Sequence, residues 1–256
     1  MWPFPPPVEP LLAVDRIISL GALCEVAYQA RRLSRTGRAY PFDWWDTPFH
    51  GVLTVLEVGA AEVFAAANIV KVPTGRGKLP AFCSRLSETI HQHEFSARED
   101  VLAMDVAEIE HRLVPKYRAL HDRLVADCAS GTTLFVRQRS PRYDVEGAAL
   151  EATLDRLHAA LSRFAADPRL LLLDYPPAAP RPWLIAAQVP RYRDRRDLGS
   201  RRGWNEVFRA HGIVCRAPGD NFGIEDLRAS FARASSLAAA IRRVMGERRA
   251  LRRGAD

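Results

Sequence analysis

The sequence predicts an α/β fold in one domain, with a mostly parallel central sheet and flanking helices. Short apolar runs typical of buried strands alternate with longer segments in which apolar residues recur every three or four positions. A chain of 256 residues can bury one sizeable core without a second domain. We expect a proline-rich extended lead-in at 1–14, the α/β domain at 15–235 and a basic helix or tail at 236–256.

Composition narrows the class of protein. Hydrophobic residues make up 48% of the chain and charged residues 26%, which is ordinary for a globular protein. No apolar run approaches the roughly 18 residues that a membrane span needs, so we expect no integral membrane segment. The N-terminus lacks a signal-peptide pattern and the four cysteines are widely spaced, which predicts reduced thiols in the cytoplasm.

The net charge of +7 is concentrated in two places. Segment 191–202 holds six arginines and two aspartates, and segment 242–253 holds six arginines and one glutamate. The remainder of the chain is therefore slightly acidic. Because the excess of basic residues is confined to these two segments, we expect no nucleic-acid partner.

The first strand, turn and helix are predicted in the segment that leads to Cys24. Ile17, Ile18 and Leu20 form the apolar run, and Gly21 permits a sharp turn. Cys24 then falls in the first turn of an amphipathic helix, where main-chain N–H groups and the helix dipole favour a thiolate. The pattern indicates a nucleophilic thiol with a lowered pKa. A cysteine that is buried only for packing would show the same sequence pattern.

Asp43 is the first acidic candidate after this helix. It lies between Phe42 and Trp44, so its carboxylate is expected to lie against aromatic surface, where it needs a partner. A helix cap or an ion pair with Arg38 explains this residue as well as a catalytic role does.

A helix, a loop and a strand are predicted next. The helix covers 49–67, with Gly59 as a possible point of interruption, and the glycine- and proline-rich loop covers 72–80. In a strand over 89–95, His91 and His93 would face the same side. Two such histidines can bind a metal, but no third ligand of suitable spacing accompanies them, so we expect no metal and no other cofactor.

The second half alternates helices and strands. Segment 98–128 carries an apolar helical stripe that Pro115 interrupts, which predicts two helices with the second beginning at that proline. Segment 143–165 repeats the helix signal. Short buried strands are predicted at 132–136, 170–173, 183–187 and 212–215.

Charged residues follow two of these strands. Arg137 and Arg139 come after the strand at 132–136, and Asp174 comes directly after the strand at 170–173. Open α/β sheets bind their ligands at the carboxyl ends of the strands, so both arginines are candidates for holding an anionic or carboxylate group. Arginines at a sheet end also cap helices or pair with acids.

Four short blocks occur in order along the chain: S-L-G-x-x-C at Ser19–Cys24, P-F-D-W at Pro41–Trp44, H-E-F at His93–Phe95 and L-F-V-R at Leu134–Arg137. Together they resemble a bacterial family of unknown function described as putative papain-like cysteine peptidases. The resemblance covers roughly the first 140 residues, and the family favours aspartate where this chain has Glu94. It implies a papain-like α+β fold, in which the cysteine helix packs against an antiparallel sheet, as the alternative to the α/β prediction.

The resemblance and the helix-start cysteine together predict a hydrolase or acyl transferase acting on a peptide or amide. Cys24 would be the nucleophile and His93 the base, because the family's histidine block falls on that residue. Asp43 or Asp174 would orient the imidazole. Main-chain N–H groups from Gly21 to Cys24 would form the oxyanion hole.

The sequence is also consistent with two other interpretations of the function. The first is an α/β transferase or binding module for sugar or nucleotide phosphates, held by Arg137, Arg139 and the arginines of segment 191–202. The second keeps Cys24 as packing in a protein that is not an enzyme. The expected partner is a small or peptidic substrate that the sequence does not name further, and no oligomeric state is predicted.

Overall fold

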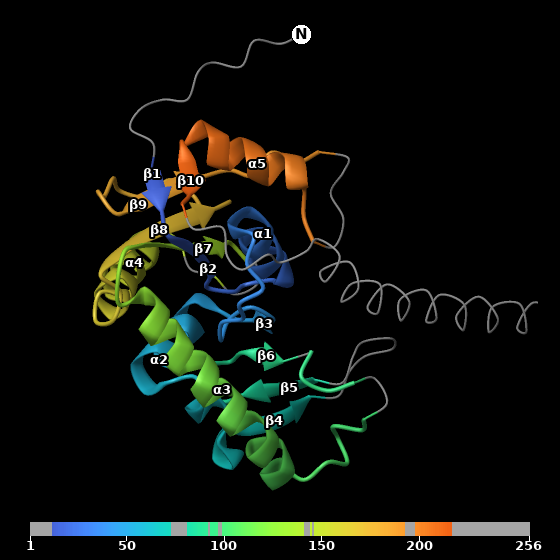
Figure 1. The fold of residues 1–256 in the computed structure, drawn as a ribbon. Coiled ribbons are helices and arrows are strands. Elements are labelled where there is room, and N and C mark those ends of the chain that lie inside the picture. The colour runs from blue at the N-terminus through green and yellow to red at the C-terminus, as the bar shows by residue number, and fades with distance from the viewer. Residues whose placement is uncertain are drawn as a thin grey trace, which may run out of the picture.

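The computed structural model describes residues 12–72, 81–91, 93–96, 99–140, 144, 146–192 and 198–216. The basic segment predicted at 236–256 and most of the loop predicted at 72–80 lie outside these residues. The described part combines helices with parallel and antiparallel sheets (Figure 1). The prediction of a mixed fold is therefore confirmed, and that of a mostly parallel sheet is confirmed only in part.

The four-stranded parallel sheet contains the strands that the sequence predicted best. Its order is β2–β7–β8–β9, and Ile18 of β2 pairs with Phe135 of β7, which pairs with Leu170 of β8. Nearly every residue of the two central strands is buried, because helices cover both faces. The strands are β2 (Arg16–Ser19), β7 (Thr132–Gln138), β8 (Asp167–Leu173) and β9 (Leu184–Ala187).

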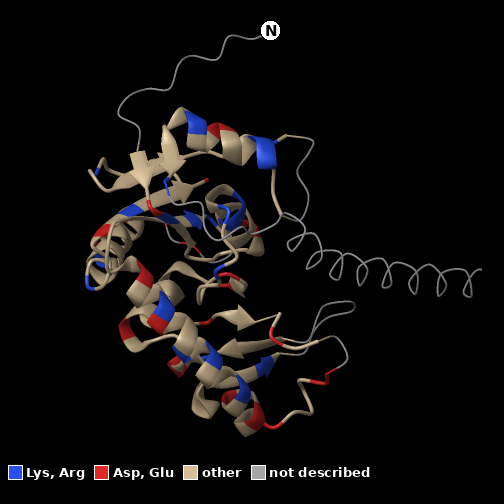
Figure 2. Cartoon of the chain, in the orientation of Figure 1, with Lys and Arg blue, Asp and Glu red and all other residues tan. Residues whose placement is uncertain are grey.

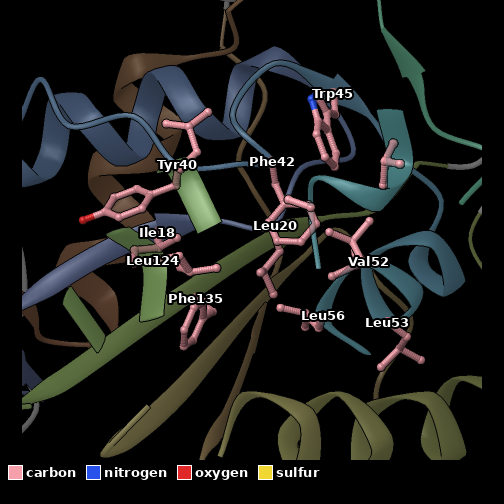
Figure 3. Close-up of a cluster of buried hydrophobic side chains, with 14 of the residues drawn as sticks. Ile18, Leu20, Tyr40, Phe42, Trp45, Val52, Leu53, Leu56, Leu124 and Phe135 are labelled. Carbon is pink, nitrogen blue, oxygen red and sulfur yellow. The ribbon is translucent and has the colours of Figure 1, made fainter. Parts of the chain in front are cut away.

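The two faces of this sheet pack against different helices. On one face, Ile17, Leu134 and Leu171 pack with α1 (Cys24–Ser34) and α5 (Arg201–Ala210). On the other face, alternate residues of the same strands pack with α2 (Phe49–Val58), α3 (Val106–Cys128) and α4 (Ala148–Leu161). Figure 3 shows this second core, where Leu20, Phe42 and Phe135 meet side chains of α2 and α3.

A second sheet, which is antiparallel, lies beside the first (Figure 1). Its order is β3–β6–β5–β4, and reasoning from composition and periodicity missed it because its strands are only two to four residues long. Of the strand predicted over 89–95, the described residues form a strand only at the two positions of β6. The strands are β3 (Trp45–Asp46), β4 (Ile69–Val72), β5 (Ala81–Ser84) and β6 (Ile90–His91), and two 3₁₀ turns (Glu62–Phe64 and Ala66–Asn68) link α2 to β4.

A short parallel pair completes the described strands. β1 (Leu12–Val14) pairs with β10 (Ile213–Cys215), so the end of the predicted proline-rich lead-in is a strand. The pair contributes Val14 and Ile213 to the core that contains α1 and α5. The two ends of the described chain are therefore fastened together.

The helix α3 corrects one prediction. It is continuous from Val106 to Cys128 with Pro115 inside it, whereas the sequence predicted a break there. Proline has no N–H group, so the carbonyl of His111 lacks the hydrogen bond that residue 115 would otherwise donate. Both residues are on the exposed side of the helix. The lost hydrogen bond therefore faces water, while the buried stripe holds both halves in one line. The stripe consists of Ile109, Leu113, Tyr117, Leu120, Leu124 and Cys128.

Charged residues of both signs share the described surface. Figure 2 shows lysine, arginine, aspartate and glutamate positions interleaved along α3 and α4. None of the helices in the described ranges has the length and the apolar composition needed to cross a membrane.

Candidate active site

The structure brings together the two residues that the sequence proposed as nucleophile and base. Cys24 is the first residue of α1, directly after the turn that follows β2. Its Sγ lies 3.2 Å from Nε2 of His93, which follows β6 in the antiparallel sheet. The distance is that of a sulfur–nitrogen hydrogen bond, so a proton can pass directly between the two side chains.

The turn before Cys24 holds a strained backbone. Gly21 and Ala22 have φ angles of +75° and +77°, in the left-handed region. Glycine adopts this conformation freely, whereas it costs Ala22 about 1–2 kcal/mol. A Cβ at Gly21 would also lie 3.4 Å from the carbonyl oxygen of Phe42. Strain of this kind persists where the surrounding structure imposes it, as is frequent at active sites.

The electrostatics of the pair differ from the prediction. The pKa of Cys24 is raised to about 11, mainly by burial and to a smaller extent by the Asp46 carboxylate, while the main-chain N–H of Cys24 acts in the opposite direction. Burial also lowers the pKa of His93, against the influence of Glu94. The predicted thiolate is therefore wrong for the resting protein, because desolvation outweighs the amides. At neutral pH the pair is a thiol and a neutral imidazole.

Asp43 is connected to His93 only through Arg31 and Trp44. Its carboxylate forms an ion pair with Arg31 and accepts a hydrogen bond of 2.9 Å from the Tyr40 N–H. The Arg31 guanidinium lies 5.3 Å from the ring centre of Trp44, and the Trp44 ring meets His93 edge to face at 6.1 Å. Among the described residues there is no hydrogen bond from Asp43 to His93, so the predicted direct contact is not formed.

The residues after His93 fasten it to α3. The Glu94 carboxylate accepts hydrogen bonds from Tyr117 and, at 2.6 Å, from the Lys116 ammonium group. Phe95 is buried, with its ring 6.0 Å from that of Phe82. These contacts hold the two residues that follow His93, while the imidazole itself contacts Cys24.

Asp174 lies at the carboxyl end of β8, as predicted, but it has other partners. Its carboxylate accepts hydrogen bonds of 2.9 Å from the Gln138 side-chain amide and from the Val189 N–H. It thereby joins the end of β7 to the segment after β9. Within the described ranges no contact links it to His93, so the structure does not support Asp174 as the residue that orients the imidazole.

Three other groups predicted to bind substrate have partners inside the protein. The Gly21 N–H donates a hydrogen bond of 3.0 Å to Ser19 Oγ, so it is not available to an oxyanion. Arg139 forms an ion pair with Glu146, which is the acid pairing that the sequence left open. In the described part of segment 191–202, Arg201 bonds to the Tyr28 hydroxyl. Each of these three groups thus has at least one partner inside the protein.

Arg137 is a structural residue and not an anion-binding one. Its side chain is fully buried, and its guanidinium lies 2.6 Å from the Asp144 carboxylate. It also donates to the Tyr175 hydroxyl at 2.9 Å and to the carbonyl oxygens of Leu20 at 3.0 Å and Thr47 at 2.9 Å. The prediction that Arg137 holds a substrate anion is therefore wrong. The residue instead ties the turn before Cys24 to the segment after β3.

Asp46 is the acidic residue that sequence reasoning missed near the nucleophile. It lies in β3, close enough to Cys24 for its charge to raise the pKa of the thiol. The signal was the alternation of a strand: Trp45 is fully buried, so its neighbour Asp46 points to the opposite side. The prediction of Asp43, which lies three residues earlier, did not take this alternation into account.

His91 does not share a site with His93. It is buried between the rings of Trp45, Phe64 and Phe82, with centroid distances of 4.8, 4.7 and 4.7 Å. Neither ring nitrogen has a hydrogen-bond partner among the described residues, and burial lowers its pKa to about 3. The predicted side-by-side pair of histidines is not formed. Within the described ranges no three His, Cys, Asp or Glu side chains gather as a metal site requires.

We expect His91 to make the fold sensitive to acid. Its pKa is about 6.5 in an unfolded chain and about 3 in the fold, so the unfolded state binds more protons between these values. The free energy of unfolding should therefore fall as the pH falls through this window, by up to about 1.4 kcal/mol per pH unit. Urea unfolding at several pH values measures this, and His91→Phe should flatten the curve. A His91→Phe curve parallel to that of the wild type would contradict the assignment.

A comparison with protein families finds a match over more than half of the chain. The family model described as "Putative papain-like cysteine peptidase (DUF1796)" matches residues 15–163, a range that contains both Cys24 and His93. No curated protein and no solved structure matches the chain.

Proposed function

The chain belongs to the family described as putative papain-like cysteine peptidases, and from this premise we propose that it is a cysteine hydrolase or acyl transferase acting on a peptide or amide bond. The observation that carries the proposal is the 3.2 Å contact between Cys24 Sγ and His93 Nε2. A nucleophile and a base within hydrogen-bond reach are the minimum that such a reaction needs.

The reaction begins from the neutral pair. Cys24 Sγ attacks the carbonyl carbon of the amide while His93 Nε2 takes the thiol proton. The resulting imidazolium gives this proton to the leaving amine, and a thioester to Cys24 remains. Water, or a second amine in an acyl transfer, then attacks the thioester with His93 again as the base. A high thiol pKa and a low imidazole pKa favour this coupled proton transfer over a standing ion pair.

Main-chain amides at the start of α1 are the proposed oxyanion hole. The helix begins after Leu23, which has no side-chain cap, so the N–H groups of Cys24 and Glu25 receive no capping acceptor. The positive end of the helix dipole lies at the same point. These two groups replace Gly21, whose N–H is used by Ser19.

Trp44 and Arg31 are the proposed positioning residues for the imidazole. Trp44 contacts the edge of His93, and Arg31 lies over Trp44 while paired with the buried Asp43. Asp43 thus serves the site by fixing Arg31, and its pKa is raised by burial despite the ion pair. In this proposal the site is a Cys24–His93 dyad in which the Trp44 ring positions the imidazole.

Trapping the acyl-enzyme tests the function. The full-length protein is incubated with a panel of peptidyl coumarin amides, and intact-mass spectrometry follows the protein while fluorescence follows the released amine. We expect an acyl adduct on Cys24 and no adduct in Cys24→Ala. The matched control is Cys83→Ala, which removes another partly exposed thiol and should leave the adduct unchanged. Equal amine release by wild type and Cys24→Ala would reject the proposal.

A further inference from the structure

A polar pocket whose lining includes neither Cys24 nor His93 lies beside the start of α1. It is lined by Glu25, Gln138 and Asp174, with Arg191 also contributing to its wall. Glu25 directly follows Cys24, and successive side chains on a helix point about 100° apart. The pocket has a volume of about 10 Å³, which is room for one group of about the size of a water molecule.

Gln138 supplies an acceptor in this pocket that has no partner. Its side chain is 4% exposed, and its Nε2 donates to Asp174 Oδ2 at 2.9 Å. Because a carboxylate oxygen accepts the bond, the amide orientation is fixed and the carbonyl Oε1 is at the free end. Oε1 is buried without a hydrogen-bond partner among the described residues. A buried acceptor of this kind indicates that a donor belongs there.

Glu25 places a negative charge beside that acceptor. It is 5% exposed, and its Oε1 accepts a hydrogen bond of 2.8 Å from the Trp204 indole N–H. Gly199 passes so close that a Cβ there would lie 2.0 Å from Oε1, so the carboxylate is held in place. Within the described ranges neither Glu25 nor Asp174 forms an ion pair. A buried carboxylate is costly without a cationic partner.

From these contacts we infer that the pocket binds a primary ammonium group of the substrate. An ammonium group carries three N–H donors and one positive charge, which match Gln138 Oε1 and the carboxylates of Glu25 and Asp174. Among the described residues that line the pocket, the two carboxylates outnumber the one guanidinium of Arg191, so this described lining carries a net negative charge that attracts a cation. The inference rests on the proposed function, because it names the substrate class: amides whose acyl part carries a primary amine.

Binding to Cys24→Ala tests the inference without requiring catalysis. Calorimetry compares three probes: glycinamide, which has an α-ammonium group, N-acetyl-lysinamide, which has a side-chain ammonium group, and N-acetylglycinamide, which has neither. We expect at least one ammonium probe to bind at least about tenfold more tightly than N-acetylglycinamide. The tighter of the two identifies the source of the amine. Equal binding of all three, or binding of none, overturns the inference.

Variants locate the binding in this pocket. Glu25→Gln keeps an acceptor for Trp204 and removes the charge, so the preference for ammonium should be lost. Glu57→Gln is the matched control, because it removes an exposed carboxylate elsewhere and should keep the preference. A preference that survives Glu25→Gln places the binding elsewhere and overturns the inference.

Asp174→Asn provides a second and sharper test. Asparagine tolerates the φ of +63° at this position. Its side-chain N–H₂ group can take the place of Asp174 Oδ2, the oxygen that accepts the hydrogen bond from Gln138. The Gln138 amide would then rotate, its oxygen would accept from the asparagine, and its own N–H₂ would point into the pocket. Ammonium binding should be lost with no change of fold by circular dichroism, whereas retention of binding contradicts the assignment. An unreactive Cys24 in the wild type would reject the proposed function and leave these binding results intact.

Discussion

Arg137→Met is expected to lower the free energy of unfolding by about 3–5 kcal/mol, because it leaves a buried carboxylate without its partner. Arg137 and Asp144 are both 0% exposed, and their atoms lie 2.6 Å apart. The substitution also removes the donors to the carbonyl oxygens of Leu20 and Thr47, which burial then leaves without partners. Urea unfolding followed by circular dichroism measures the loss.

Two further variants isolate this ion pair. Arg139→Met, two residues along the chain, removes a partly exposed arginine paired with an exposed glutamate and should cost less than about 1 kcal/mol. In the double variant Arg137→Met with Asp144→Asn, no uncompensated charge remains, so its loss should be smaller than the sum of the single losses. Strict additivity would show that the two side chains do not interact.

His93→Ala is expected to lower kcat/KM by about 10²–10⁴-fold, since it removes the proposed general base. The 3.2 Å contact places Nε2 where the thiol proton must leave. His111→Ala is the matched control, because His111 is exposed on α3 and distant in sequence from both catalytic groups. A loss in both variants, or in neither, would contradict the role given to His93.

The pH profile distinguishes a neutral pair from a standing ion pair. Catalysis by the neutral pair needs His93 unprotonated and Cys24 protonated. The pKa of His93 is lowered from 6.5, so the rising limb of kcat/KM should lie below about pH 6.5. The pKa of Cys24 is raised to about 11, so the plateau should extend past pH 9. A falling limb near pH 8 would show that the pair is ionised at rest.

The sequence predicted the parallel half of the fold well. Ile17 and Ile18 of β2, like the apolar runs of β7 and β8, are buried on both faces by helices, and such strands have an unmistakable composition. Gly21 likewise indicated the turn that its φ of +75° confirms. These features depend on residues close together in the chain.

The antiparallel half depends on contacts between distant residues and was poorly predicted. Its strands are too short for a periodic signal, and only the family resemblance suggested an antiparallel sheet. The roles of Arg137 and Asp174 were misjudged because a charged residue at a strand end looks the same whether its partner is a substrate or a buried Asp144. The pKa of Cys24 was misjudged because burial cannot be read from a helix start.

The rate at which iodoacetamide alkylates Cys24 tests the central claim most directly, because it needs no knowledge of the substrate. Wild type, His93→Ala and His111→Ala are compared at about pH 8, and mass spectrometry of the Cys24 peptide gives each rate. With a thiol pKa of about 11 and no base, His93→Ala should react at least about tenfold more slowly than the other two. Indistinguishable rates in all three proteins would show that His93 does not act on the Cys24 sulfur.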